Sequence, residues 1–172
     1  DSNWDYISQV RMLGLDHYYG NPISSHADDN LNLIGIGQVV ALTPDQHFNI
    51  MACMQFVGEF GEDKVHCLQK TKSNGNEKHS VAEEYHGKLL MGGNVSYTQM
   101  ASLLSQGAEI KHTKLSESFT YQHYLDHHKD NLMIPLFHVE EKGKIQFCDD
   151  PDQFKPPTTS TVVALIQSVE TQ

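Results

Sequence analysis

Histidine is the residue type with the most chemistry to offer in this chain, because it can bind metal ions and carry protons near neutral pH. Among the 11 histidines, His123, His127 and His128 fall in one segment that predicts a short helix. His123 and His127 are four positions apart and so share a helix face, as pairs of helical metal ligands do. No cysteine or second histidine pair lies near them, so we favour a solvated helix face and predict no metal site.

The histidines could also act together as a pH sensor. With neutral histidines the formal charge is −10, from 12 Lys and Arg against 22 Asp and Glu. Protonating all 11 would bring the charge to +1. An unperturbed histidine titrates at about pH 6.5, which is close to the cytosolic range. The number of histidines therefore predicts a pH response of the whole chain.

The nucleophilic side chains form no catalytic pattern. No serine stands in a Gly-x-Ser-x-Gly elbow, and neither His-Glu-x-x-His nor a phosphate-binding loop with lysine occurs. Cys53, Cys67 and Cys148 are far apart, odd in number and set among apolar residues. Buried free thiols in a reducing compartment explain them better than a disulfide or a metal site. We predict that the chain is not an enzyme and has no catalytic residues.

The composition argues against two kinds of partner. A pI near 5.4 leaves no surplus of basic residues to offset a phosphate backbone, which argues against nucleic acid. The mean hydropathy is −0.46, and no apolar run approaches the length of a bilayer span. Since a span needs roughly 20 apolar residues, no direct insertion into a membrane is predicted.

Residues 1–70 predict short helices alternating with short strands. A helix capped by Ser2 is expected over 3–13, a brief strand near 17–19, and a second short helix after Ser24 or Ser25. The pattern is typical of an α/β fold.

The clearest local signal is Thr43-Pro44-Asp45-Gln46. It combines an N-cap threonine, a first-turn proline, an acid, and a glutamine able to complete a capping box. It predicts a helix over 44–60, between strands at 38–42 and 64–68. A strand, a helix and a strand joined by short links form a βαβ unit, whose two strands are parallel.

The rest of the chain predicts a polar linker and then a second subdomain. Residues 71–85 are polar and charged, contain Asn-Gly-Asn at 74–76, and predict a linker. Residues 86–172 predict a compact α+β subdomain, with helices expected from Ser96 to about 106 and over 121–128. The expected strands are 87–91, 108–115, 133–139, 144–148 and 161–169. An antiparallel hairpin is expected at Glu141-Lys142-Gly143.

The order of these motifs resembles that of a known class of regulatory domain. YGNPIS at 19–24 and GIGQVVALTPDQHFNIMA at 35–52 are similar to the later half of the Rossmann-type nucleotide-binding domains that regulate bacterial potassium transporters and channels. HGKLLMGGNVSYTQMASLLSQGAEIKHTKLSESFTYQHY at 86–124 and MIPLFHVEEKGKIQF at 133–147 resemble the tail of bacterial cation/proton antiporters, mainly the Na⁺/H⁺ kind. In such antiporters a membrane-embedded transport domain precedes a cytosolic tail.

The sequence departs from this class in one important respect. A complete domain begins with a strand, a Gly-x-Gly-x-x-Gly turn and a helix, and that fingerprint does not occur here. Gly35-Ile36-Gly37 is a false match, because it precedes a strand and lacks the third glycine. The implied fold is α/β: a truncated Rossmann-like parallel sheet lacking its first two strands, followed by a small α+β subdomain. The strands near 17–19 and 38–42 would then pair with each other, pair across a dimer, or stay exposed.

The resemblance implies a ligand site at the carboxyl ends of the parallel strands. Asp1 corresponds to a ribose-contacting acid, Gly20 and Asn21 to the turn near the ligand, and Thr43 to the end of the central strand. Asn49 corresponds to an asparagine in the next helix. An intact domain would bind NAD or an adenine nucleotide there, but no cofactor is predicted for this fragment. Each residue also has a plainer explanation: Thr43 as a helix cap, Gly20 as a turn residue and Asp1 as a chain end.

The implied function is that of a cytosolic regulatory region of a bacterial monovalent cation/proton antiporter. Its expected partners are the transporter's own membrane domain, at the cytoplasmic face of the inner membrane, and a second copy in a homodimer. Two other functions stay open: a piece of a soluble NAD(P)-dependent oxidoreductase, and an interaction domain without a ligand. The oxidoreductase is disfavoured because no Tyr-x-x-x-Lys pair or catalytic His/Asp set accompanies the βαβ unit.

Overall fold

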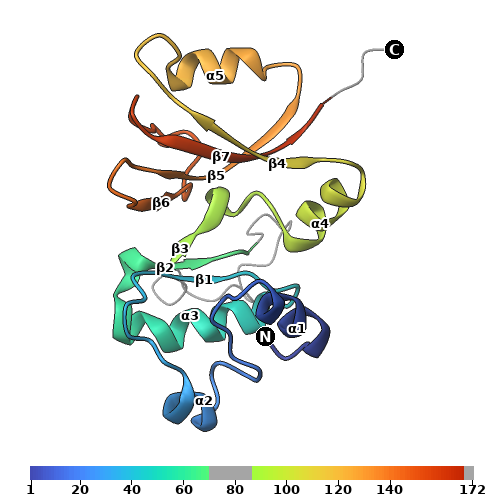
Figure 1. Ribbon diagram of the computed structural model, residues 1–172, viewed down its shortest axis with the longest axis vertical. Coiled ribbons are helices and arrows are strands. Elements are labelled where there is room, and N and C mark those ends of the chain that lie inside the picture. Colours follow the sequence, from blue (N-terminus) through green and yellow to red (C-terminus); the bar gives the residue numbers. More distant parts are fainter. Residues whose placement is uncertain (70–86, 169–172) are drawn as a thin grey trace, which may run out of the picture.

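The computed structural model describes residues 1–69 and 87–168 as a mixed α/β chain with two sheets (Figure 1). The first, here called the parallel sheet, has three parallel strands in the order β1-β2-β3. The second, the antiparallel sheet, has four strands in the order β4-β7-β5-β6. The predicted linker at 71–85 lies outside the described residues. In the described ranges, no helix has the length and apolar character needed to cross a membrane.

Two short helices begin the chain. Helix α1 (Trp4–Met12) is capped by Asn3, whose side chain accepts hydrogen bonds from the backbone, so the prediction of Ser2 as the cap is wrong. Asparagine caps a helix as well as serine does, and the two residues are adjacent. Helix α2 (Ser25–Asn30) follows the cap Ser24, which confirms one of the two predicted starts.

The strand predicted near 17–19 is wrong, because that segment is a loop. The carbonyl of Tyr18 accepts from the amino group of Asp1 at 3.0 Å, and the N–H of Gly20 donates to the carbonyl of Asp1 at 3.0 Å. The carbonyl of Tyr18 and the N–H of Gly20, which could pair with a neighbouring strand, are therefore bonded to Asp1. A strand depends on its partner, which the composition of a short segment does not specify.

The parallel sheet contains the predicted βαβ unit. Strands β1 (Val39–Ala41) and β2 (Val65–Cys67) pair in parallel, and helix α3 (Gln46–Phe60) connects them. Strand β3 (Lys88–Leu89) pairs in parallel with the other side of β2. A short 3₁₀ turn, η1 (Glu62–Lys64), links α3 to β2. In the described part of the chain β2 is thus the central strand and β1 an edge strand.

Helix α3 begins two residues later than predicted. Its N-cap is Asp45, whose carboxylate accepts from the N–H groups of His47 at 2.9 Å and Phe48 at 3.1 Å. Thr43 is therefore not the cap, and Gln46 is the first helical residue rather than the third that a capping box requires. The difference arises because the hydroxyl of Thr43 is used elsewhere, as described below.

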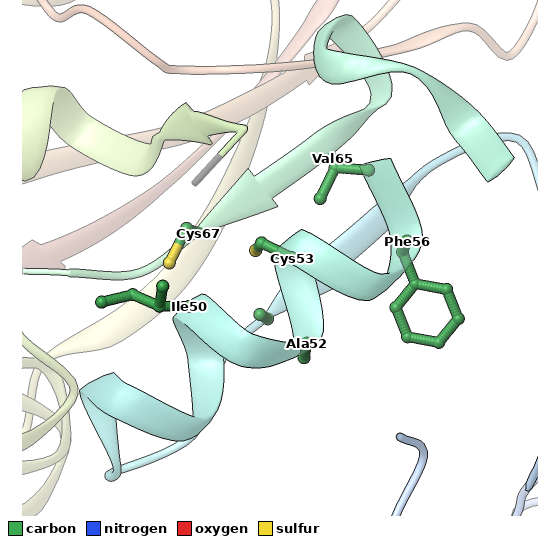
Figure 2. Close-up of a cluster of buried hydrophobic side chains, with 7 residues drawn as sticks. Ile50, Ala52, Cys53, Phe56, Val65 and Cys67 are labelled. Atoms are coloured by element: carbon green, nitrogen blue, oxygen red, sulfur yellow. The ribbon is translucent and has the colours of Figure 1, made fainter. Parts of the chain in front are cut away.

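Alternation along β2 decides which side chains meet helix α3. Val65 and Cys67 face the helix and are fully buried, whereas His66 between them faces the opposite side of the sheet. Figure 2 shows Ile50 and Cys53 of the helix on its side toward β2, near Val65 and Cys67, and Phe56 pointing away from the strand. The buried members of the cluster between helix and sheet are Ala41, Ile50, Ala52, Cys53, Phe56, Val65 and Cys67.

The order of elements predicted for the second half is confirmed, with bounds that differ by one or two residues after Ser96. Ser96 is the N-cap of the first helix, accepting from Gln99 N–H at 3.2 Å. The elements are η4 (Leu90–Gly93), α4 (Tyr97–Ser105), β4 (Glu109–Lys114), α5 (Tyr121–His127), β5 (Leu132–Val139), β6 (Ile145–Phe147) and β7 (Thr161–Gln167). Strands β5 and β6 form the predicted antiparallel hairpin.

The strand predicted over 87–91 ends early, at Leu89. Met91 and Gly92 adopt positive φ angles of 52° and 62°, which no strand allows. In this conformation their N–H groups donate to the carbonyls of Cys148 and Asp149. The chain thus turns out of the parallel sheet and bonds to the segment that follows β6.

Figure 1 shows the two sheets stacked between α3 and α5. Side chains of both halves meet in a shared cluster, with Val40 of β1 packed against it. Its buried members are Leu68, Leu90, Met91, Val95, Ala108, Ile134 and Leu165. On β7, Leu165 belongs to this cluster, while Ala164 and Ile166 belong to the one beside α5. Strand β7 therefore presents apolar side chains on both faces of the antiparallel sheet.

Gly87 is the point where β3 comes closest to β2, and it predicts a large effect of substitution. Its φ is +66°, and a methyl group there would collide with the carbonyl of Val65. We expect Gly87→Ala to lower the free energy of unfolding by about 2–4 kcal/mol, because backbone strain and overlap add together. Urea unfolding measures this.

Gly107 supplies the matched control for that experiment. Its φ is +92°, but a methyl group there would meet open space. Gly107→Ala should cost only the conformational strain, about 1 kcal/mol. Equal losses for the two variants would contradict the close contact at Val65.

Candidate functional site at the junction of the two sheets

The junction between the sheets holds a buried histidine bonded on both sides. His66 is 3% exposed, and it lies at the centre of β2 on the face away from α3. Its Nδ1 is 2.8 Å from Oδ1 of Asp149, and its Nε2 is 3.0 Å from Oε1 of Gln38. The ring of Phe147 lies against the imidazole, with centroids 4.6 Å apart. His66 therefore joins the residue before β1 to the segment after β6.

The orientation of the Gln38 amide is set by a third group. Its Nε2 donates to the carbonyl of Ile145 at 2.8 Å, and a carbonyl can only accept. The amide oxygen must therefore be the atom that faces His66. Gln38 thus forms a second bond between the two sheets, because Ile145 is the first residue of β6.

Two more charged groups extend the network to the surface. Nζ of Lys88 is 3.0 Å from Oδ1 of Asp63 and 3.9 Å from Oδ2 of Asp149. The hydrogen bond between Lys88 and Asp63 lowers the pKa of the Asp63 carboxyl group and raises the pKa of Lys88. Asp63 is exposed, so this outer ion pair adds little stability.

A cleft of about 430 Å³ opens beside this network. Charged residues of both signs line it. The basic ones include Lys88 and Lys155, and the acidic ones include Glu140, Asp149 and Asp150. Asp149 is 29% exposed, so its carboxylate has one side toward His66 and one toward solvent. The cleft gives the buried histidine a route to water through this carboxylate.

No pattern in the sequence predicts this network. Its members lie on different elements, and His66 is 28 positions from Gln38 and 83 from Asp149. The one local signal was a histidine at the middle of the predicted strand KVHCL, where an apolar residue would be expected. That signal does not identify the partners.

Thr43 and Asn49 form a second polar centre, at the carboxyl ends of β1 and β2. Asn49 is fully buried, and its Oδ1 accepts from the N–H of Thr43 at 2.9 Å and from the hydroxyl at 2.6 Å. Its Nδ2 donates to the carbonyls of Thr43 and Leu68, each at 3.0 Å. All four hydrogen-bonding positions of the amide are used. This centre ties the ends of the two strands together.

The other residues of the predicted ligand site lie in the amino-terminal loop. Asp1 and Gly20 are joined by the backbone bond described above, and Asp1 also accepts from the N–H of Asn3. The side chain of Asn21 accepts from the N–H of Ile23 at 3.0 Å. Their roles in ligand contact stay predictions.

The histidines are not equivalent, which refines the prediction of a collective pH response. His123 completes a capping box with Thr120 at the start of α5, so it has a structural use. Burial lowers the pKa of His138, and burial together with the charge of His127 lowers that of His128. These two histidines resist protonation in the folded chain. Within 1–69 and 87–168, no three His, Cys, Asp or Glu residues are grouped to hold a metal ion.

The cysteines are free and buried, as predicted. The hydrogen bond with Cys67, together with burial, raises the pKa of the Cys53 thiol well above its usual range. Burial, with the nearby charges of Asp149 and Asp150, raises the pKa of Cys148 to about 12. Both thiols are thus held in the protonated form, which is a poor nucleophile.

Comparisons with family models, with curated proteins and with solved structures find no match to this chain.

The buried amide of Asn49 should be essential for stability. Asn49→Leu leaves the N–H of Thr43 and two carbonyls without partners, so we expect a loss of more than about 2 kcal/mol in urea unfolding. Thr43→Ser keeps the hydroxyl and should lose under about 1 kcal/mol. Similar, small losses in both variants would be incompatible with the four bonds described.

His138 should make the fold sensitive to acid. It is 5% exposed, and its Nδ1 has no hydrogen-bond partner among the described residues. Since its pKa is lowered in the fold, the unfolded chain binds the proton first, and stability falls as the pH drops below about 6.5. We expect His138→Leu to gain about 1 kcal/mol relative to the parent between about pH 6.5 and pH 5.

The measurement is urea unfolding at a series of pH values. His112, which is exposed on β4, supplies the control, and His112→Gln should keep the acid sensitivity of the parent. Parallel pH curves for the parent and His138→Leu would show that this residue is not responsible.

Proposed function

We propose that this chain is the cytosolic regulatory region of a bacterial monovalent cation/proton antiporter. The membrane domain of such a protein would use the proton gradient to exchange Na⁺ or K⁺, and the region described here would adjust its activity. The order and spacing of the sequence motifs support this assignment over nearly the whole chain.

The observation that carries the proposal is the order of the parallel sheet, which places β1 at an edge. In a doubly wound Rossmann sheet the later three strands lie side by side in chain order, and the fourth strand pairs with the first. Strands β1, β2 and β3 have that sequential parallel order, with β1 at the edge. An edge of this kind favours the addition of another strand. A truncated Rossmann-like sheet, completed by a preceding part of the transporter, fits this arrangement.

Exposed apolar side chains in the first half support a covered surface in the whole protein. The large ones include Trp4, Met12, Leu13, Ile34 and Met51. We propose that these side chains are covered by a partner in the whole protein. The proposed covering is the transporter's own preceding domain, or a second copy in a homodimer at the cytoplasmic face of the inner membrane.

The proposal does not include a nucleotide bound by this chain alone. The hydroxyl of Thr43 is 2.6 Å from Asn49, and the amide of Asn49 is fully used within the fold. These groups shape the carboxyl ends of the strands but offer no free donor to a ligand. Binding of NAD or an adenine nucleotide would require the glycine-rich turn of a complete domain.

Regulation requires two arrangements that a signal stabilises differently. In this proposal the two sheets are the parts that change their relative arrangement, and the junction between them is where the signal acts. A histidine network at that junction favours protons as the signal, which suits a proton-coupled transporter.

The test uses the complete gene product in sealed vesicles with a pH-sensitive dye inside. Adding Na⁺ or K⁺ should move protons, and deleting residues 1–172 should shift the apparent cation affinity or the pH midpoint by at least about fivefold, a typical allosteric coupling. The equally expressed full-length variant His47→Gln, changed at an exposed position of α3, serves as the comparison, because both sheets are retained.

Three outcomes would contradict the proposal. Vesicles that move no protons when cations are added would remove the transporter assignment. A complete gene product that is a soluble enzyme oxidising or reducing substrates with NAD(P) would favour the oxidoreductase instead. Unchanged transport after the deletion would leave an interaction domain with no part in regulation.

A further inference from the structure

We propose that His66 is a proton-dependent clamp, which strengthens the contact between the two sheets when its ring is protonated and weakens it when the ring is neutral. The clamp consists of His66, Gln38 and Asp149. The inference deepens the proposed function by naming the residue through which pH would act, and it rests on that function only for its physiological meaning.

The two hydrogen-bond partners of His66 determine how many protons its ring must carry. Asp149 presents a carboxylate oxygen to Nδ1, and Gln38 presents its amide oxygen to Nε2. Both oxygens are acceptors, so both ring nitrogens must donate. Only the imidazolium form has two N–H groups, because neutral imidazole has one donor and one acceptor.

Turning the Gln38 amide around does not remove this requirement. Its nitrogen would then face Nε2 of a neutral ring, but its oxygen would face the carbonyl of Ile145, which is also an acceptor. One hydrogen bond is lost in either orientation. A neutral His66 therefore forms one hydrogen bond fewer within this network, and with the Gln38 amide bonded to Ile145 its Nε2 faces an acceptor without a proton between them.

The charges around the ring come from both halves of the molecule. Asp149 follows β6 and favours a positive ring, while Lys88 on β3 lies 3.9 Å from that same carboxylate and opposes it. Asp63 in η1 offsets Lys88 at 3.0 Å. On the other side the ring meets Phe147 of β6, and Cys53 of α3 reaches only the backbone carbonyl of His66. The nearest charge is thus the carboxylate.

The clamp controls the junction rather than the fold of either half. Gln38 and His66 belong to the parallel-sheet half, and their partners Ile145 and Asp149 belong to the β6 segment. Each half has its own apolar cluster, beside α3 and beside α5. Loss of the proton weakens the bonds between the halves while these clusters persist.

The direct test is nitrogen NMR of the 172-residue chain labelled with ¹⁵N-histidine. At about pH 6, both ring nitrogens of His66 should show the shifts of a protonated imidazolium. His66→Gln identifies the signals, because they disappear in that variant. Neutral-ring shifts for His66 at this pH overturn the proposal, and this reading is made on the parent chain once the signals are assigned.

The functional test is urea unfolding at a series of pH values between about 5.5 and 8.5, which bracket the titration of ordinary histidine. Both hydrogen bonds of the closed junction need the protonated ring, so raising the pH removes one of them and destabilises the junction. The folding constant of the parent relative to His66→Gln should fall at least about tenfold over this range, since one proton gives up to tenfold per pH unit.

A matched control separates the clamp from general histidine charge. His47 is exposed on α3, in the same half of the molecule. His47→Gln removes the same titratable group and should follow the pH curve of the parent. His138 gives the parent and His66→Gln the same acid sensitivity, so only the difference between them reports on the clamp. A difference in stability between the parent and His66→Gln that does not change with pH overturns the clamp.

The clamp and the transporter assignment are tested by separate experiments, so either can fail without the other. The clamp is measured on the chain alone, whereas antiport is measured on the complete gene product in vesicles. Proton-dependent stability without antiport would retain the clamp and remove the transporter. Antiport without a protonated His66 ring would retain the transporter and remove the clamp.

Discussion

A buried polar side chain must keep its hydrogen bonds, and this constraint shapes the contact between the two sheets. His66 occupies a position on β2 where an apolar residue would be cheaper to bury. Its partners come from the residue before β1 and from the segment after β6, so the register of the two halves depends on it. Around it, Val40, Leu68 and Leu165 form an apolar cluster that has no such directional requirement.

Side chains along β2 alternate between the two faces of the parallel sheet, and each face has its own role. Val65 and Cys67 fill the space under α3, while His66 turns to the junction. Asn49 on α3 then bonds to the ends of both neighbouring strands, so helix and sheet are fixed by an amide as well as by apolar contact. Polar centres thus stand on both faces of a short, otherwise apolar sheet.

The junction also explains why a pH response need not involve all the histidines. His138 and His128 have lowered pKa values because of burial, and His123 caps a helix. His66 differs from them because both its nitrogens face acceptors. Such a residue separates a specific response at one interface from a diffuse change in net charge.

The sequence alone determined the local elements. The apolar strand at 38–42, the periodic helix to Phe60 and the hairpin at Gly143 were all predicted, because period and turn chemistry are local properties. Parallel pairing of β1 and β2 also followed, since the short links between the elements of a βαβ unit permit little else. The free, buried cysteines were predicted from their apolar neighbours.

Only the tertiary structure decided the partners. The segment at 17–19 has strand-like residues but bonds to the chain end, and Thr43 gave its hydroxyl to Asn49, which left Asp45 as the cap. The network at His66 joins residues 28 and 83 positions away, and no local pattern encodes such separations. Hydrogen bonds between distant side chains depend on how the sheets stack, and that depends on the whole chain at once.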